Sequence, residues 1–228
     1  PATRQYVLFE AKTAIEQIQT LPSHLSALDL GCATGPFTKI LASRFEKVTA
    51  VDVSPEMCAE ATTQLNDQPN VRVVNADFET EEFWTSLGTE RFNFITLTLG
   101  TASDVVNLDR LLANIEKHLS SEGKVLLSFY NKEALVYSAG FLPWKPSLAA
   151  ILDPDFSTVT VKEEYILHAR GYTISELRDR SYGNMYVSGT TSYPTLLPVF
   201  PPELLANETT LSTICEMEQS NSHKGAYI

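Results

Sequence analysis

The chain has 228 residues, of which 43% are hydrophobic and 20% are charged, as is ordinary for a globular protein. Its 28 acidic side chains outnumber 17 basic ones and give a formal net charge of −11. Lys and Arg nowhere cluster, which argues against a protein that binds nucleic acid through its phosphates, because such contacts need a basic face. The length suits one domain of generous size, or one domain with an insertion, and we treat residues 1–228 as a single domain.

Three cysteines (Cys32, Cys58 and Cys215) are too few and too widely spaced for a disulfide framework or a zinc site. We therefore expect free thiols, a reducing cytoplasm and no bound metal. The sequence shows no signal-peptide pattern, and no apolar run approaches the roughly 18 residues of a membrane-spanning helix, so we expect neither. The chain begins at Pro1 rather than Met, which leaves open whether it is part of a longer protein. Its oligomeric state, monomer or dimer, also stays open.

The first 130 residues alternate predicted strands and helices. Short apolar runs predict strands at 27–30, 48–53, 71–75, 92–99 and 124–130, and apolar residues at helical spacing predict helices at 36–45, 55–66 and 108–119. Pro36 and the pair Ser54-Pro55 are typical of helix starts, and Gly123 of a helix end. Such alternation predicts a parallel sheet covered on both faces, which binds ligands at the carboxyl ends of its strands, where the strand order reverses.

The second half has a different pattern. Residues 131–152 read as a helix followed by an aromatic stretch that prolines interrupt. Predicted strands at 158–172 and 185–193, helices at 175–180 and 203–218, and a terminal strand at 225–228 follow.

The most informative stretch is LDLGCATGP, residues 28–36, in which a glycine loop follows the first predicted strand. Glycines there let the backbone turn sharply and approach a ligand, although a plain structural turn has the same pattern. The spacing Gly31-x-Ala33-x-Gly35 lacks the third glycine of the dinucleotide fingerprint, and no Gly-Lys-Ser/Thr follows as in a P-loop. Both of these nucleotide-binding motifs are therefore excluded.

Acidic residues end the next two predicted strands. A carboxylate at Asp52 can accept both hydroxyls of a ribose that lies across the crevice. The alternative is an N-terminal helix cap, but Ser54 already supplies that function. Asp77 can accept a hydrogen bond from an adenine amino group, with Phe78 offering apolar contact, or it can be an ordinary solvated loop residue.

Four runs carry a resemblance: LDLGCATG, VTAVDVSPEM, NADFE and FNFITLTLGTAS. Over residues 25–130 they resemble the class I S-adenosylmethionine-dependent methyltransferases. The resemblance implies an α/β, doubly wound, Rossmann-like sheet of seven strands, mostly parallel with an antiparallel last strand, plus an inserted substrate lid. It also implies S-adenosyl-L-methionine as the cofactor and S-adenosyl-L-homocysteine as the product. The chain departs from the family at Ala33 and Pro36, where glycine is commoner, and at Asn93, where Asp is frequent, so Asn93 is given no role.

Carried over by position, the resemblance implies one set of residues for each part of the cofactor. These sets are Asp29, Gly31, Cys32, Ala33 and Gly35 around the methionine part and the ribose, Asp52 at the ribose hydroxyls, Val53 and Met57 against adenine, Asp77 and Phe78 at the adenine edge, and Leu99 with Gly100 at the sulfonium end.

No catalytic signature is obligatory for this chemistry, because the cofactor carries the reactivity and a base is needed only when the acceptor is protonated. The candidate catalytic groups are Tyr130, Asn131 and His168. We expect the insertion 131–172 and the connection 194–218 to cap the strand ends and to hold the acceptor. Candidate acceptor-binding residues are Tyr6, Asn131, Tyr137, Phe141 and Trp144, although the aromatic ones can equally form a satellite core.

The sequence therefore predicts a cytoplasmic methyltransferase that acts on an oxygen or nitrogen atom of a small molecule. One alternative is a tRNA or protein acceptor, and the acidic balance counts against RNA. Another is a non-catalytic S-adenosylmethionine-binding domain of a larger protein. No membrane partner is expected.

Overall fold

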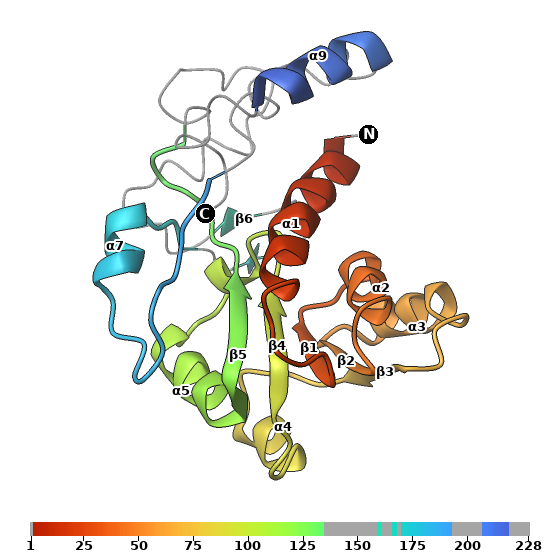
Figure 1. Cartoon of the computed structure of the whole chain (residues 1–228), viewed down its shortest axis with the longest axis vertical. Helices are drawn as coiled ribbons and strands as arrows, with labels where there is room; N and C mark the ends of the chain where they lie inside the picture. Colours follow the sequence, from red (N-terminus) through yellow and green to blue (C-terminus); the bar gives the residue numbers. More distant parts are fainter. Residues whose placement is uncertain (1, 135–158, 161–165, 168–169, 193–206, 219–228) are drawn as a thin grey trace.

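The computed structural model describes residues 2–134, 159–160, 166–167, 170–192 and 207–218, and its centre is a five-stranded parallel sheet (Figure 1). The strand order is β3-β2-β1-β4-β5, so the direction in which strands are added reverses between β1 and β4. These strands confirm the five predicted in the first 130 residues. Their bounds are β1 (Ser26–Leu30), β2 (Lys47–Asp52), β3 (Val71–Asn75), β4 (Phe92–Leu97) and β5 (Leu119–Leu127).

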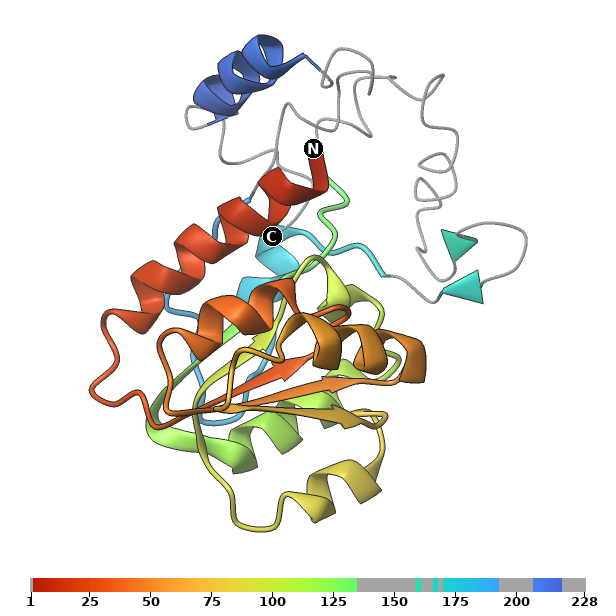
Figure 2. The same ribbon diagram turned by 90° about the vertical axis from the view of Figure 1, so that its right-hand side faces the viewer.

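Helices cover both faces of this sheet (Figure 2). On one face lie α1 (Ala2–Ile18), α2 (Pro36–Ala42) and α3 (Pro55–Gln64), and on the other lie α4 (Glu81–Ser86) and α5 (Leu108–His118). A short 3-10 helix, η1 (Thr101–Ser103), follows β4 on the way to α5. The doubly wound arrangement that the sequence predicts is therefore present in the described part of the chain.

Local sequence explains where α2 and α3 begin. Each starts with a proline, Pro36 and Pro55, whose missing N–H costs no intrahelical hydrogen bond at that position. Ser54 is the N-cap of α3, because its side chain accepts a hydrogen bond from the backbone N–H of Met57 at 3.2 Å. The predicted cap at Ser54 is confirmed.

Two apolar cores fix the sheet between the helical layers. Large buried side chains from α4 and α5 fill one face, whereas smaller ones from α1 and several from α2 fill the other. Burial of this kind is the main favourable contribution to folding. Representative members are Phe83, Trp84, Leu111, Leu112 and Ile115 in the first core, and Ala11, Ala14, Ile18, Phe37 and Leu41 in the second.

The sequence analysis did not predict α1 or α4. In the described part of α1 the buried residues are Glu10, Ala11, Ala14 and Ile18. Most of them are small or charged, so the sequence lacks the row of large apolar residues that indicates an amphipathic helix. The helix α4 has only six residues, which is too short for a clear period. Both helices form because the sheet gives them a surface to pack on.

The predicted helix end at Gly123 is wrong. Helix α5 ends at His118, and Leu119 already has extended backbone angles and pairs with Phe92 of β4. Gly123 therefore lies inside β5, and strand pairing overrides the local Ser-Glu-Gly signal for a helix cap.

The second half confirms two helices and corrects one strand. The helices α7 (Ile174–Asp179) and α9 (Glu208–Glu218) match the predictions near 175–180 and 203–218. Residues 185–192 form no strand, and Asn184, just before them, donates its backbone N–H to Glu116 of α5 at 3.0 Å. Residue 193 and the expected terminal strand 225–228 lie outside the described residues.

The predicted strand at 158–172 is present only in pieces. The described parts are β6 (Val159–Thr160) and β7 (Ile166–Leu167), which pair antiparallel with each other in a separate small sheet, and an isolated parallel bridge between Asn131 and Tyr172. The described part of the main sheet thus has five strands rather than seven, without an antiparallel member. The expected helix at 131–152 is described only for 131–134, which form a bridge and a turn.

Candidate functional site

The glycine loop between β1 and α2 is bound to the end of β2. The N–H groups of Gly31 and Cys32 both donate to the carbonyl of Val51, at 2.8 and 2.9 Å. Gly31, Ala33 and Gly35 have φ angles of 74°, 48° and 87°, in the left-handed region that favours glycine. The loop therefore folds back over the carboxyl ends of β1 and β2, next to the strand-order reversal.

Gly31 is required by packing inside the protein. A Cβ atom at this position would lie 2.6 Å from the Cγ2 methyl of Thr101, which comes from η1. The absence of a side chain thus lets the glycine loop and the loop after β4 touch. The structure shows Gly31 packed closely against Thr101, and its approach to a ligand stays a prediction.

Asp52 joins β2 to the glycine loop. One carboxylate oxygen, Oδ2, accepts the backbone N–H of Ala33 at 2.8 Å, and the other, Oδ1, accepts the N–H of Ser54 at 2.9 Å. A carboxylate has about four lone-pair positions, so each oxygen retains capacity for a ligand hydroxyl. Asp52 is thus a loop brace and, at the same time, a polar group half-exposed at the strand end.

An apolar surface adjoins this carboxylate. Val53 is 65% exposed and Met57 is 41% exposed, which is high for side chains of this type. After β3, Asp77 is exposed and its Oδ1 accepts the N–H of Glu79 at 2.8 Å, a local turn contact. Phe78 is partly buried, and its carbonyl accepts the indole N–H of Trp84 at 2.7 Å.

Asp29 is completely buried beneath the glycine loop. Its Oδ2 accepts the hydroxyl of Thr38 at 2.6 Å and its Oδ1 that of Thr96 at 2.9 Å, so it joins β1 to α2 and β4. Burial raises the pKa of Asp29 to about 6; the two threonine hydrogen bonds counteract this effect, and the charge of Asp52 adds to it. Burial likewise raises the pKa of the neighbouring Cys32 thiol far above its ordinary value.

The loop after β4 contains two consecutive residues in the left-handed region, Leu99 at φ 54° and Gly100 at φ 86°. The Leu99 N–H donates to Oε2 of Glu10 at 2.7 Å, and the Gly100 N–H donates to the hydroxyl of Ser128 at 3.1 Å. Neither Glu10 nor Ser128 was a candidate in the sequence analysis. The available signal was the spacing of Glu10, Ala14 and Ile18, which places a carboxyl group in line with apolar helix positions.

Asp104, just after η1, is a second residue that the sequence analysis missed. Within the described part of the structure, its Oδ1 is buried and has no hydrogen-bond partner. Burial raises the pKa of this carboxyl to about 7. The adjacent Ser103 is bonded on both sides, since its hydroxyl accepts the N–H of Tyr130 at 2.8 Å and its carbonyl that of Arg170 at 2.8 Å.

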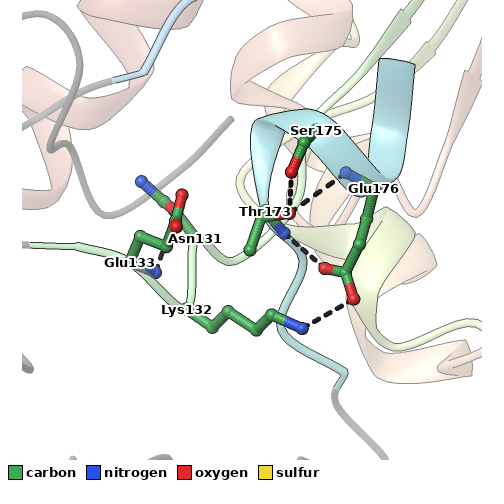
Figure 3. Close-up of polar contacts among 6 residues, drawn as sticks. All are labelled: Asn131, Lys132, Glu133, Thr173, Ser175 and Glu176. Carbon is green, nitrogen blue, oxygen red and sulfur yellow. Dashed lines mark hydrogen bonds and ion pairs between the residues drawn. The ribbon is translucent and has the colours of Figure 1, made fainter. Parts of the chain in front are cut away.

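The structure gives Asn131 a local bracing position (Figure 3). It is 1% exposed, and its Oδ1 accepts the N–H of Glu133 at 3.0 Å. The next residue, Lys132, forms an ion pair with Glu176 at 2.7 Å, and Glu176 and Thr173 form the capping box that begins α7. Asn131 therefore braces the turn after β5, and the neighbouring Lys132 links this turn to α7.

The other candidates for catalysis and acceptor binding stay predictions. Tyr130 is partly buried and follows β5. Tyr6 belongs to α1, but its side chain lies outside the described part. Tyr137, Phe141, Trp144 and His168 also lie outside the described residues, as does most of the expected cap.

The described residues contain no group of three or more His, Cys, Asp or Glu side chains arranged to hold a metal ion. Among the same residues, no helix is long and apolar enough to cross a membrane. Cys32 and Cys58 are free and buried, in agreement with the expectation for those two thiols.

Comparison with known proteins identifies the segment that carries this site. Residues 27–123 match the family described as methyltransferase domain. This segment is similar to class I S-adenosylmethionine-dependent methyltransferases. The match begins in β1 and ends in β5, so it includes the glycine loop, Asp52, Asp77 and the loop after β4. The methyl donor of such enzymes is S-adenosylmethionine.

Individual relatives agree with this family. A malonyl-acyl-carrier-protein O-methyltransferase of Bacillus cereus is 34% identical over 108 residues, which cover 46% of this chain and 38% of that protein. A ubiquinone biosynthesis O-methyltransferase of Rickettsia akari is 25% identical over 120 residues, or 53% of this chain and 46% of that protein. The chain thus spans less than half the length of these curated relatives.

A solved S-adenosylmethionine-dependent methyltransferase of Clostridium acetobutylicum shares the fold. Its TM-score is 0.54 at 18% identity, and the match covers 81% of this chain and 86% of that chain. At this identity the likeness establishes the α/β Rossmann-like architecture.

The residues of the methyltransferase domain fit the methyl donor by their chemistry. Asp52 offers carboxylate lone pairs, which suit the two ribose hydroxyls, and Val53 and Met57 offer exposed apolar surface, which suits a flat base. Asp52 contacts the glycine loop next to the strand-order reversal, where such sheets bind ligands.

Proposed function

We propose that the protein transfers a methyl group from S-adenosylmethionine to an oxygen or nitrogen atom of a small-molecule acceptor. The observation that carries the proposal is the contact between Asp52 and the N–H of Ala33, which holds a half-exposed carboxylate beside the glycine loop within the segment that matches the methyltransferase domain. The two curated relatives described above are named O-methyltransferases, which favours oxygen as the acceptor atom.

Bound S-adenosylmethionine would supply an electrophilic methyl group, so the task of the chain is to position the two reactants. We assign the ribose to Asp52, the face of adenine to Val53 and Met57, and its edge to Asp77 and Phe78. The glycine loop and Asp29 would surround the methionine part, and Leu99 with Gly100 the sulfonium end. No step of this assignment requires a metal ion.

Asp104 is the described residue that best suits proton acceptance on the acceptor side. It follows the loop assigned to the sulfonium end by four positions, and its buried Oδ1 has no partner among the described residues. A carboxyl group with a pKa of about 7 can hold a proton at neutral pH and release it again. We assign Asp104 the role of a base toward a hydroxyl or ammonium acceptor, ahead of His168.

The binding half of the proposal is tested by titrating the purified protein with S-adenosylmethionine. Asp52→Ala should weaken binding by about 10- to 150-fold, because a charge-assisted hydrogen bond contributes roughly 1.5–3 kcal/mol. The matched control is Asp67→Ala. Asp67 is exposed and pairs with Lys39 at 3.5 Å, and it precedes β3, so it lies at the end of the strands opposite to Asp52. Equal affinities for wild type and Asp52→Ala, with unchanged melting temperatures, would contradict the ribose assignment.

The catalytic half is tested by radiolabel transfer from methyl-labelled S-adenosylmethionine. A small-molecule extract, a tRNA pool and a protein pool serve as separate acceptors. Label in the small-molecule fraction supports the proposal, whereas label in tRNA or protein selects an alternative acceptor. Tight binding of the donor without transfer to any fraction would favour a non-catalytic binding domain.

A further inference from the structure

A single carboxyl group from α1 controls the backbone after β4. Glu10 is 1% exposed, and its Oε2 accepts the N–H of Leu99 at 2.7 Å across a separation of 89 residues. Its Oε1 accepts the hydroxyl of Ser128 at 2.5 Å, and that hydroxyl oxygen accepts the N–H of Gly100 at 3.1 Å. Glu10 thus binds two successive backbone N–H groups, one directly and one through Ser128.

These contacts stabilise an unfavourable local conformation. A non-glycine residue at positive φ, such as Leu99 at 54°, is uncommon and persists where its surroundings determine it. Leu99 and Gly100 are the residues that we assign to the sulfonium end of the cofactor. The position of that end therefore depends on a helix outside the matched segment 27–123.

The direction of the hydrogen bonds favours the ionised carboxylate. As an anion, Glu10 accepts from Leu99 and from the Ser128 hydroxyl, while the Ser128 oxygen remains free to accept from Gly100. If Glu10 were protonated, its own proton would point at Ser128, and the serine proton would need another acceptor. The geometry is therefore complete only with the charge present.

No described cation balances this buried charge. The charged group of the sheet that interacts electrostatically with Glu10 is Asp29 of β1, which is also negative and raises the pKa of Glu10. The charged neighbour of Asp29 is a further carboxylate, Asp52. From the segments that follow β4 and β5, the hydrogen-bond partners of Glu10 are the neutral groups of Leu99 and Ser128. A buried anion of this kind is unfavourable unless it has an electrostatic partner.

We propose that Glu10 is a positioning residue for the sulfonium end of S-adenosylmethionine, and that its negative charge makes the site prefer this cationic donor over the neutral sulfide S-adenosylhomocysteine. The inference rests on the proposed function. It gives the buried charge a partner that is present before methyl transfer and lost after it, so the product is held less tightly than the donor. In support, burial and the charge of Asp29 raise the pKa of Glu10 to about 7, although its two hydrogen bonds lower it. Part of the protein is therefore protonated at Glu10 near neutral pH, and a donor that prefers the carboxylate releases that proton when it binds.

The experiment measures the affinities of the purified full chain for S-adenosylmethionine and S-adenosylhomocysteine by calorimetry at pH 8. Glu10→Gln keeps the shape of the side chain and removes its charge, so it should weaken donor binding by on the order of tenfold and product binding within about twofold. Ser128→Ala keeps the charge and breaks the link to Gly100, so both affinities should fall together. Glu16→Gln, an exposed change on the same helix, is the control.

A second readout is proton release, obtained from calorimetry at pH 7 in buffers of different ionisation enthalpy. Wild type should release protons on binding the donor but not the product, and Glu10→Gln should release fewer. Equal losses of donor and product affinity in Glu10→Gln, or unchanged proton release, would overturn the inference while leaving the proposed function intact. Absence of donor binding to the wild type would instead refute the proposed function, and the inference with it.

Discussion

Replacing Glu10 by Gln should stabilise the ligand-free protein at alkaline pH and leave its stability almost unchanged near pH 5. The pKa of this carboxyl is raised from 4.5 to about 7 in the folded state, chiefly by burial. The folded protein therefore binds a proton more tightly than the unfolded chain does. Its free energy of unfolding must fall as the pH rises from about 4.5 to about 7.

The size of the effect follows from the two pKa values. One pH unit corresponds to about 1.4 kcal/mol, so the change from 4.5 to about 7 costs the wild type roughly 3 kcal/mol above pH 7. Gln resembles the protonated form and does not titrate, and it can still accept from Leu99 and donate to Ser128. The Ser128 proton then loses the carboxylate as its acceptor, so roughly 3 kcal/mol is the upper bound of the gain. For a domain of this size, roughly 3 kcal/mol corresponds to a melting temperature about 6–12 °C higher at pH 8.

The measurement is urea unfolding of wild type, Glu10→Gln and the surface control Glu16→Gln at pH 5, 6, 7 and 8, without ligand. The difference between wild type and Glu10→Gln should grow through this range and then level off. A constant difference at all pH values, or a less stable Glu10→Gln protein at pH 8, would refute the argument that Glu10 is a buried, unbalanced charge. The control should follow the wild type throughout.

Two further predictions concern the loops on either side of the site. Gly31→Ala should destabilise the fold by about 1–3 kcal/mol, because the new Cβ would clash with the Thr101 methyl and because φ at this position is +74°. Adding Thr101→Ser removes that methyl but keeps the hydroxyl that donates to the Thr98 carbonyl. The double variant should therefore recover part of the lost stability, as measured by urea unfolding. Asp104→Asn should remove the rise of methyl-transfer rate with pH around about pH 7, and it should raise stability at pH 8 but not at pH 5, because the Asp104 carboxyl has a raised pKa. A pH–rate profile that keeps its wild-type shape in Asp104→Asn would exclude Asp104 as the base.

The sheet and the surroundings of the glycine loop are predictable because they follow from short-range patterns. The apolar runs of β1 to β5 have clear lengths and boundaries, and parallel neighbours bring their carboxyl ends to one edge. Proximity of Asp52 to the glycine loop follows from that rule alone, and the structure shows the contact to Ala33. The ligand roles of these residues remain predictions.

Errors arose where long-range pairing decides between two local signals. The sequence around Gly123 has the features of a helix end, yet Leu119 leaves the helix early because Phe92 offers a strand partner. Residues 185–192 have strand composition, but composition does not supply a neighbour, and Asn184 binds α5 instead. In both cases the deciding residue lies far away in the chain.

Glu10 could not be assigned from the sequence for a related reason. An acidic residue on a helix is usually solvated, and its partners Leu99 and Ser128 are 89 and 118 residues away. Only the fold shows that Glu10, Asp29 and Asp104 are all carboxyl groups whose pKa burial raises, and that all three lie near the carboxyl ends of β1, β4 and β5. Each destabilises the ligand-free protein at neutral pH, so stability alone would favour neutral side chains at these positions. All three lie at the edge that we assign to the cationic methyl donor, which supports the proposal that a bound ligand interacts with these carboxyl groups.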